Sequence, residues 1–444
     1  MPKYDLQIKN ATIVTENTIF KGNIVVKSGK IVGIYKDSSH DSYETIDAEG
    51  YYLLPGMIDE HVHFMEPCEN EREDWIHGTA SAAVAGVTTV VEHTHRCPVR
   101  SVEEFEKKKE YVKGRSYIDF GLAAHVWPGY YKEIPKLWER GVSFFKIFTL
   151  NLHDVPGHNN YMLFKVLSLI ASVNGLSLIH AEDESIIRGM QEELRTEGAN
   201  ILQRWRNKVA EEVAVSNVIK IAEITRAKVT IAHASHPKVV QMVHEARSRG
   251  VDVWVESCPQ YLFLDENILA QDERLFKFTP PARSKEEAQN MVELLQQEKI
   301  DIVASDHAPA TKEMKTRGDI WTGIFGIPGI QTTLPLLLKL VSENKLSLTT
   351  IVKVYSRNPA IRLGLYPKKG TIMIGSDADF VIIDPEKKWT ITDEWIISKA
   401  RWTPYAGFSV TGKPIMTIVR GKKVVENDKI AIEPGWGEYI ERNL

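Results

Sequence analysis

The chain has 444 residues, of which 43% are hydrophobic and 26% are charged. This length exceeds what one hydrophobic core usually supports, so we expect a large domain and a smaller one, and the composition excludes a disordered chain. The 55 Lys and Arg residues and the 59 Asp and Glu residues leave a net charge of −4, which provides no field to attract nucleic acid or an anionic membrane.

The cysteines and the first residues bear on the cellular compartment. Cys68, Cys97 and Cys258 are widely spaced and odd in number, which favours free thiols in a reducing compartment over a disulfide framework. Residues 1–5 carry no apolar signal segment, and no uncharged apolar run is as long as the ~18 residues that a membrane helix needs. We therefore expect a cytoplasmic protein.

Both ends of the chain show the alternation of apolar and polar residues that is typical of half-buried strands. The pattern covers residues 5–14 and 22–34, with glycine and asparagine turns, and it returns at residues 377–384 and 415–425. Because chain ends often lie close together, we expect residues 1–54 and 366–444 to build one antiparallel β domain.

Between the two ends, eight short apolar runs alternate with stretches of helical periodicity. The runs cover residues 53–63, 86–95, 118–126, 142–149, 176–182, 228–235, 251–259 and 300–309. Helices are predicted at residues 102–113, 161–173, 211–226, 238–249 and 285–297. This α/β alternation predicts a (β/α)₈ TIM barrel over residues 55–365, with a doubly wound sheet as the weaker alternative.

The predicted barrel strands end in polar residues. Active sites of such barrels lie at the C-terminal ends of the strands, so these residues are candidates for chemistry. His61 and His63 end the first run and, being two apart on a strand, point to the same face. His180 ends the fifth run, His233 the sixth and Asp306 the eighth. A single histidine has a structural role as easily as a metal-binding one. Four histidines at three strand ends, together with a carboxylate, predict a divalent-metal site of the zinc type.

Lys146 is an unusual residue in the fourth run, because it lies among Phe144, Phe145 and Phe148. A buried ammonium group is costly unless it is paired or neutralised. One interpretation is a salt bridge to a carboxylate. The other is a lysine that has taken up carbon dioxide as a carbamate, which could bridge two metal ions, and the residues alone leave both open.

Seven segments together carry a family resemblance, namely residues 55–64, 86–90, 145–148, 180–182, 256–262, 305–309 and 375–379. In these segments, which span nearly the whole chain, the protein resembles the cyclic amidohydrolases of the amidohydrolase superfamily. That group includes dihydroorotases, hydantoinases or dihydropyrimidinases, and allantoinases. The resemblance implies a hydrolase of cyclic amides, a β-sandwich built from both chain ends, and a homodimer or homotetramer.

The resemblance also implies a binuclear centre, with zinc as the expected ion. Its ligands are divided between two divalent ions: His61, His63 and Asp306 hold the first, His180 and His233 hold the second, and carboxylated Lys146 bridges them. In this scheme, hydroxide attacks the ring amide, and Asp306 acts first as general base and then as general acid. Some dihydropyrimidinase-like proteins are non-catalytic scaffolds that lack the ligands, whereas this chain keeps all six.

Four positions are expected to contact the substrate. Met65 stands where dihydroorotases carry an arginine for the substrate carboxylate, and Asn151 stands where hydantoinases carry a tyrosine. His95 aligns with a substrate-binding asparagine of the relatives, and Arg96 follows it. Residues 63–67 and 321–331 look most like allantoinases. These features predict a neutral cyclic ureide, with allantoin first, a hydantoin or dihydropyrimidine as the alternative, and dihydroorotate disfavoured.

Other residues near the predicted mouth leave alternatives open. His93 and His95 form a second His-x-His pair, but a third metal ion is the less favoured hypothesis because no third ligand is evident. Substrate contact or plain packing is expected there instead. Arg283 matches a family motif and is as easily a structural salt bridge. The remaining histidines, among them His125 and His158, have no predicted role.

Overall fold

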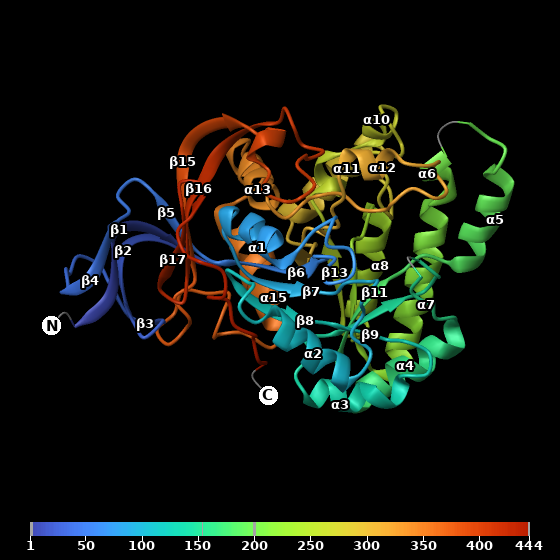
Figure 1. Ribbon diagram of the computed structural model, residues 1–444, viewed down its shortest axis with the longest axis horizontal. Coiled ribbons are helices and arrows are strands. Elements are labelled where there is room, and N and C mark those ends of the chain that lie inside the picture. The colour runs from blue at the N-terminus through green and yellow to red at the C-terminus, as the bar shows by residue number, and fades with distance from the viewer. Residues whose placement is uncertain (1–2, 153, 199–200, 443–444) are drawn as a thin grey trace.

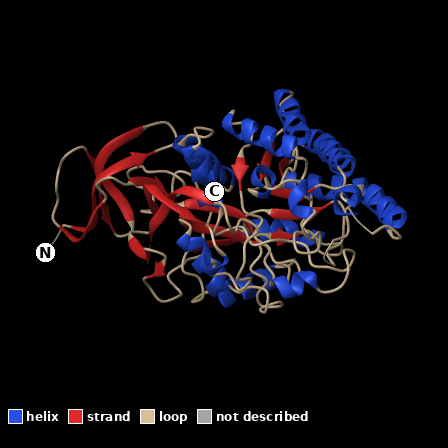
Figure 2. Cartoon of the chain, turned by 90° about the horizontal axis from the view of Figure 1, so that it is seen from above, coloured by secondary structure: helices blue, strands red, loops and turns tan. Residues whose placement is uncertain are grey.

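The computed structural model describes residues 3–152, 154–198 and 201–442 (Figure 1). A β domain forms one end of the elongated molecule, and a barrel covered by helices forms the rest (Figures 1 and 2). The strand ends of the barrel position the candidate site.

The barrel consists of short parallel strands in sequence order. They are β6 (Met57–Val62), β7 (Val87–Glu92), β8 (Asp119–Leu122), β9 (Ala124–His125), β10 (Phe145–Phe148), β11 (Leu176–His180), β12 (Lys228–Ile231), β13 (Val253–Ser257) and β14 (Ile302–Val303). Strands β6 to β8 pair in order, as do β9 to β14, and β8 and β9 together form the third predicted run. A parallel bridge between Val62 and His307 joins the last strand to the first. The predicted (β/α)₈ barrel is thus confirmed.

Helices surround the strands, and these helices include all five that the sequence predicts. They are α1 (Trp75–Val84), α2 (Val102–Val112), α3 (Ile134–Glu139), α4 (Asn160–Ser172), α5 (Glu184–Leu194), α6 (Ile201–Trp205), α7 (Lys208–Thr225), α8 (Pro237–Ser248), α9 (Gln260–Phe263), α10 (Glu266–Leu269), α11 (Lys285–Gln296), α12 (Lys312–Thr316), α13 (Thr333–Ser342), α14 (Leu348–Val352) and α15 (Asn358–Arg362). Local chemistry sets their starts: Ser101 caps α2 by accepting a hydrogen bond from the Glu104 amide, and Ser284 forms a capping box with Glu287 at α11.

The β domain takes strands from both ends of the chain. They are β1 (Tyr4–Val14), β2 (Ile19–Lys27), β3 (Lys30–Tyr35), β4 (Ser42–Asp47), β5 (Tyr52–Pro55), β15 (Phe380–Thr390), β16 (Ser409–Val419), β17 (Lys422–Glu426) and β18 (Lys429–Ile430). Leu6, Ile24, Phe380 and Ile418 pack in one buried cluster, so the two ends share a hydrophobic core. This confirms the expected β-sandwich of both chain ends.

The expectation of a purely antiparallel pattern is wrong for β1, which runs parallel to β4 and to β5. Alternation shows that a strand is half-buried, but it carries no information on the direction of the neighbouring strand. The limits of the two domains at residues 54 and 365 stay a prediction. At the far end of the chain, the amide of Ile440 donates to the carbonyl of Phe120, so the last described residues lie against β8 of the barrel.

The expectation of three free cysteines is wrong for two of them. Cys68 and Cys97 form a disulfide with their Cα atoms 6.0 Å apart, and Cys258 is a buried free thiol. The sequence separation of 29 hid the pairing, because α1 and β7 fold between the two cysteines and bring their loops together. Within the described residues, no helix combines the length and the apolar character needed to cross a bilayer.

Candidate functional site

All six predicted metal ligands lie at strand ends and line a single cavity of the barrel. His61 lies in β6 and His63 just after it, Lys146 lies in β10, His180 ends β11, and His233 and Asp306 follow β12 and β14. The strands are parallel, so their C-terminal ends open at the same mouth and bring residues that are far apart in the sequence together.

The distances between these side chains are those of a compact polar cluster. Nε2 of His61 lies 3.1 Å from Nζ of Lys146 and 3.2 Å from Oδ1 of Asp306. Nε2 of His63 lies 3.3 Å from the same Asp306 oxygen. The ring centroids of His180 and His233 are 4.5 Å apart. The carboxylate of Asp306 therefore faces the two histidines that the sequence predicts as its partners.

The backbone at two of these positions is in the left-handed region. His233 has φ = +40° and Asp306 has φ = +47°, which non-glycine residues rarely adopt. Such strained residues persist where the surrounding structure holds them, and they are concentrated at functional sites.

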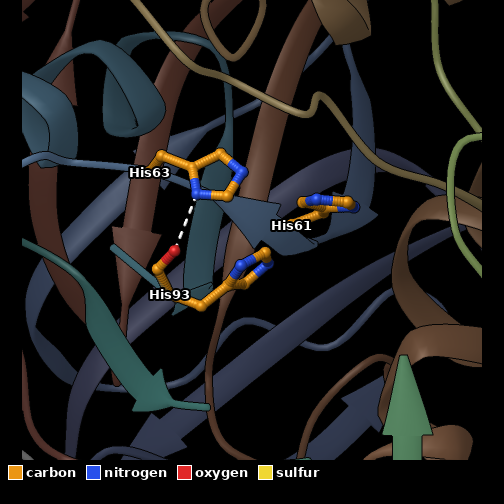
Figure 3. A group of neighbouring side chains, drawn as sticks. All are labelled: His61, His63 and His93. Atoms are coloured by element: carbon orange, nitrogen blue, oxygen red, sulfur yellow. Dashed lines mark hydrogen bonds between the residues drawn. The ribbon is translucent and has the colours of Figure 1, made fainter. Parts of the chain in front are cut away.

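A second layer of hydrogen bonds orients three of the rings. Nδ1 of His61 donates to Oε1 of Glu256 at 2.7 Å. Nδ1 of His63 donates to the carbonyl oxygen of His93 at 2.7 Å, and Figure 3 shows this second bond. Nε2 of His180 donates to Oε2 of Glu182 at 2.7 Å. These bonds leave Nε2 of His61, Nε2 of His63 and Nδ1 of His180 as acceptors for a ligand.

Burial sets the charge state of the cluster. It lowers the pKa of Lys146 to about 8 and, together with the Lys146 ammonium, lowers the pKa of His61 well below its ordinary value. Nδ1 of His233 is buried without a hydrogen-bond partner. Neutral imidazoles, a lysine with weakened proton affinity and an orphaned ring nitrogen are the donor set that divalent ions of the zinc type accept, so the residues fit such a centre.

The cavity also has apolar walls, which the sequence analysis did not predict. Phe148, Leu152, Phe278 and Phe325 line it, with Thr279 adding a hydroxyl group. Two of them lie in segments that carried the family resemblance or the allantoinase likeness, residues 145–148 and 321–331. Leu152 and Phe278 come from loops, where no periodicity marks a residue as buried.

The four predicted substrate contacts lie in different places. His95 lines the cavity beside the cluster, and Met65 and Arg96 line an adjoining cavity with it. The guanidinium group of Arg96 is 3.0 Å from Asp154.

The structure does not bring Asn151 to either cavity. Its side-chain amide donates to Glu184 at 3.0 Å, and its side-chain oxygen accepts from the Gly157 amide at 3.1 Å. These bonds hold it in the loop after β10, on the surface. Arg283 proves to be structural, since it pairs with buried Glu211 at 3.0 Å.

Comparisons with known proteins place the chain in a family. The amidohydrolase family profile matches residues 52–424. The chain is 33% identical over 456 residues to the L-hydantoinase of Paenarthrobacter aurescens, which covers 99% of this chain and 98% of that protein. It is 34% identical over 441 residues to a dihydroorotase of Methanothermobacter thermautotrophicus, with coverage of 98% and 97%. An Escherichia coli allantoinase is 32% identical over 435 residues and covers 95% of each chain.

Among solved structures, the L-hydantoinase (dihydropyrimidinase) from Arthrobacter aurescens matches with a TM-score of 0.96 at 31% identity, over 99% of this chain and 100% of that chain. These findings confirm the resemblance seen in the motifs: the chain belongs to the amidohydrolase family.

Proposed function

We propose that this protein is a metal-dependent hydrolase that opens an amide bond of a small, neutral cyclic ureide. The observation that carries the proposal is the cluster of four histidines, Lys146 and Asp306 at one cavity of the barrel. Arrangements of imidazole and carboxylate groups at such a mouth suit metal-assisted hydrolysis.

In the proposed centre, two divalent ions are bound, with zinc as the expected ion. His61, His63 and Asp306 would hold one, His180 and His233 would hold the other, and Lys146, carboxylated at Nζ, would be a ligand of both. When bound, such ions lower the pKa of water and polarise a substrate carbonyl. The low proton affinity of buried Lys146 supports the carbamate, because carbon dioxide adds to the neutral amine.

The proton transfers belong to Asp306. Its Oδ1 lies 3.2 Å from His61 and 3.3 Å from His63, so it is held at the centre of the cluster. We propose that it accepts the proton of the attacking water and delivers it to the ring nitrogen that leaves. His95 and Thr279 at the cavity wall are positioned to hydrogen-bond the ring.

The walls of the cavity bear on the substrate. Among the described residues that line it, Lys146 is the one Lys or Arg, so this cavity offers no further cationic side chain for a substrate carboxylate such as that of dihydroorotate. Arg72 and Arg96 line the adjoining cavity, where they pair with Glu69 and Asp154. Phe148, Leu152, Phe278 and Phe325 favour an apolar ring substituent. A hydantoin with an apolar substituent at C5 therefore suits the cavity best. Allantoin, whose ring carries a polar ureido group, is the second candidate, supported by the likeness of residues 63–67 and 321–331 to allantoinases.

A turnover panel tests the substrate proposal. Metal-loaded protein is assayed with 5-benzylhydantoin, hydantoin, allantoin, dihydrouracil and dihydroorotate. We expect the highest kcat/KM for 5-benzylhydantoin, and Leu152→Ala should reduce its advantage over unsubstituted hydantoin by about tenfold. Ile268→Ala, a change in a partly buried residue outside the cavity, is the control. Dihydroorotate as the best substrate would refute the argument from the walls.

Metal removal tests the hydrolase proposal itself. Dialysis against a chelator should abolish turnover, and zinc or cobalt should restore it. A protein that stays fully active after metal removal contradicts the proposal. A protein that binds no metal and stays inactive even after zinc or cobalt is added would instead support a scaffold role.

We further propose a homodimer or homotetramer, to be checked by light scattering, and a cytoplasmic location. The Cys68–Cys97 disulfide is unusual for that compartment, so thiol titration of the freshly isolated protein tests the location.

A further inference from the structure

Three more histidines lie beside the six-residue cluster. His93 and His95 follow β7, and His125 ends β9, the neighbouring part of the barrel wall. The ring centroids of His93 and His125 are 6.0 Å apart, and those of His95 and His125 are 5.5 Å apart. One ring nitrogen from each lies within 4.8 Å of the other two. Small ring rotations would place all three around one point, at the ~2 Å that a zinc–imidazole bond requires.

The ring nitrogens of two of these residues lack protein partners. His93 and His125 are 1% and 2% exposed, and neither Nδ1 nor Nε2 of either residue has a hydrogen-bond partner among the described residues. Buried polar atoms are normally satisfied, so four orphaned nitrogens on two adjoining rings require an explanation. A cation that accepts the lone pair of one nitrogen on each ring accounts for two of them.

The surroundings do not provide another partner. Phe144 packs against His93, with ring centroids 5.6 Å apart, and Phe148 is stacked on His125 at 6.2 Å. The carboxylate of Glu92 is next in sequence, but it pairs with Lys108 at 2.5 Å and accepts from Thr94. The rings are therefore enclosed by apolar groups and by carboxylate oxygens that are already used, and the rings of His61 and His63 lie 4.6 and 4.4 Å from that of His93.

We propose that His93, His95 and His125 form a third divalent-metal site, which adjoins the six-residue centre through His93 but shares none of its six residues. Three neutral imidazoles suit zinc, copper, nickel and cobalt rather than magnesium or calcium. His95 also lines the substrate cavity, so the fourth coordination position opens towards it. An ion there takes water or an oxygen atom of the bound ring as its fourth ligand.

His125→Phe tests the site, because it keeps an aromatic ring in the stack and removes the ligand. The matched control is His158→Phe: His158 is also 2% exposed, and both its ring nitrogens lack partners, but it belongs to no group of three potential ligands among the described residues. Each full-length protein is equilibrated with zinc alone, desalted and subjected to elemental analysis. His125→Phe should hold one ion fewer per chain than the wild type and the control.

A second variant keeps the proposal falsifiable if His125→Phe does not fold. His95→Gln lies at the cavity wall, and it should also lose one ion. Equal zinc contents in the wild type, the control and a folded site variant would overturn the third site. This test distinguishes the third site from the binuclear centre. A zinc content that falls from three ions per chain in the wild type to two in the variant supports both sites, and a fall from one to zero supports the third site alone. Two ions per chain in both proteins support the binuclear centre alone.

Discussion

At the scale of single residues, Lys146 carries the sharpest chemical prediction. Lys146→Ala removes the bridging group, so turnover should fall by about a thousandfold or more, since metal-assisted catalysis supplies several kcal/mol of transition-state stabilisation. Acetate or propionate should restore part of the activity, because a small carboxylate can occupy the space of the carbamate. The wild type should gain nothing from the same acids. Activity that survives the substitution would contradict the carbamate.

Glu256 is predicted to position His61 rather than to contact the substrate. It is fully buried, accepts from Nδ1 of His61 at 2.7 Å and accepts from the amide of His233 at 3.0 Å. Glu256→Gln should weaken zinc affinity by about 10–100-fold, the usual effect of losing such an orienting partner. Competition with a chromogenic chelator measures the affinity. Glu212→Gln, which removes a carboxylate 3.1 Å from His236 and outside the cavity, should leave it unchanged.

At the scale of elements, the start of α1 depends on Asp74. Its side chain accepts from the amide of His77 at 2.7 Å and from the His77 ring at 2.8 Å. Although burial raises the pKa of Asp74, the His77 bonds outweigh it and lower the pKa to about 2, while that of His77 is raised, chiefly by the bond to Asp74. Asp74→Ala should reduce the free energy of unfolding by about 1 kcal/mol at neutral pH.

The effect of Asp74→Ala should depend on pH. The carboxylate contribution is present above the unfolded pKa of about 4 and is lost as the pH falls towards the folded value. The contribution of the His77 cation is present below about 6.5 and is lost as the pH rises through its raised folded pKa. The loss in melting temperature should therefore be largest between about pH 4 and about pH 6.5. Ser101→Ala, which removes the uncharged cap of α2, should show no such profile.

At the scale of the whole molecule, a buried ion cluster joins the two domains. Nζ of Lys369 is 2.6 Å from Asp119 of β8 and 2.6 Å from Asp379 beside β15, and Asp377 is 3.1 Å away. Arg420 also pairs with Asp119, and Lys30 pairs with Asp377. The three carboxylates are thus neutralised by side chains of the protein, and the cluster holds the barrel against the β domain.

Lys369→Met should therefore destabilise the protein strongly. It leaves the carboxylates without their central cation, which costs about 3–5 kcal/mol in buried ion pairs. Urea denaturation measures the loss. Lys312→Met breaks an exposed pair with Asp393 and should cost at most about 1 kcal/mol. A similar small loss for both variants would show that the cluster does not hold the domains together.

The sequence by itself determined the barrel, the β domain of both ends and the six residues that meet in the cavity. Strand-end polarity is local: His61, His180 and Asp306 each follow a buried run in their own segment, and parallel closure then brings every strand end to one mouth. Lys146 was marked by its own neighbours, because an ammonium group among phenylalanines is costly wherever the run packs.

The tertiary structure alone decided which distant residues lie beside these six. His125 showed no signal in the sequence, since a single histidine near a strand end reveals its partners only when β9, paired with β10, brings it close to His93 and His95. The same holds for the Cys68–Cys97 bond, for the Leu152 and Phe278 walls, and for Asn151, whose amide is held by Glu184. The periodicity of apolar residues indicates which face of a helix or strand is buried. Contacts between loops depend instead on how the elements are placed in space, which no local pattern encodes.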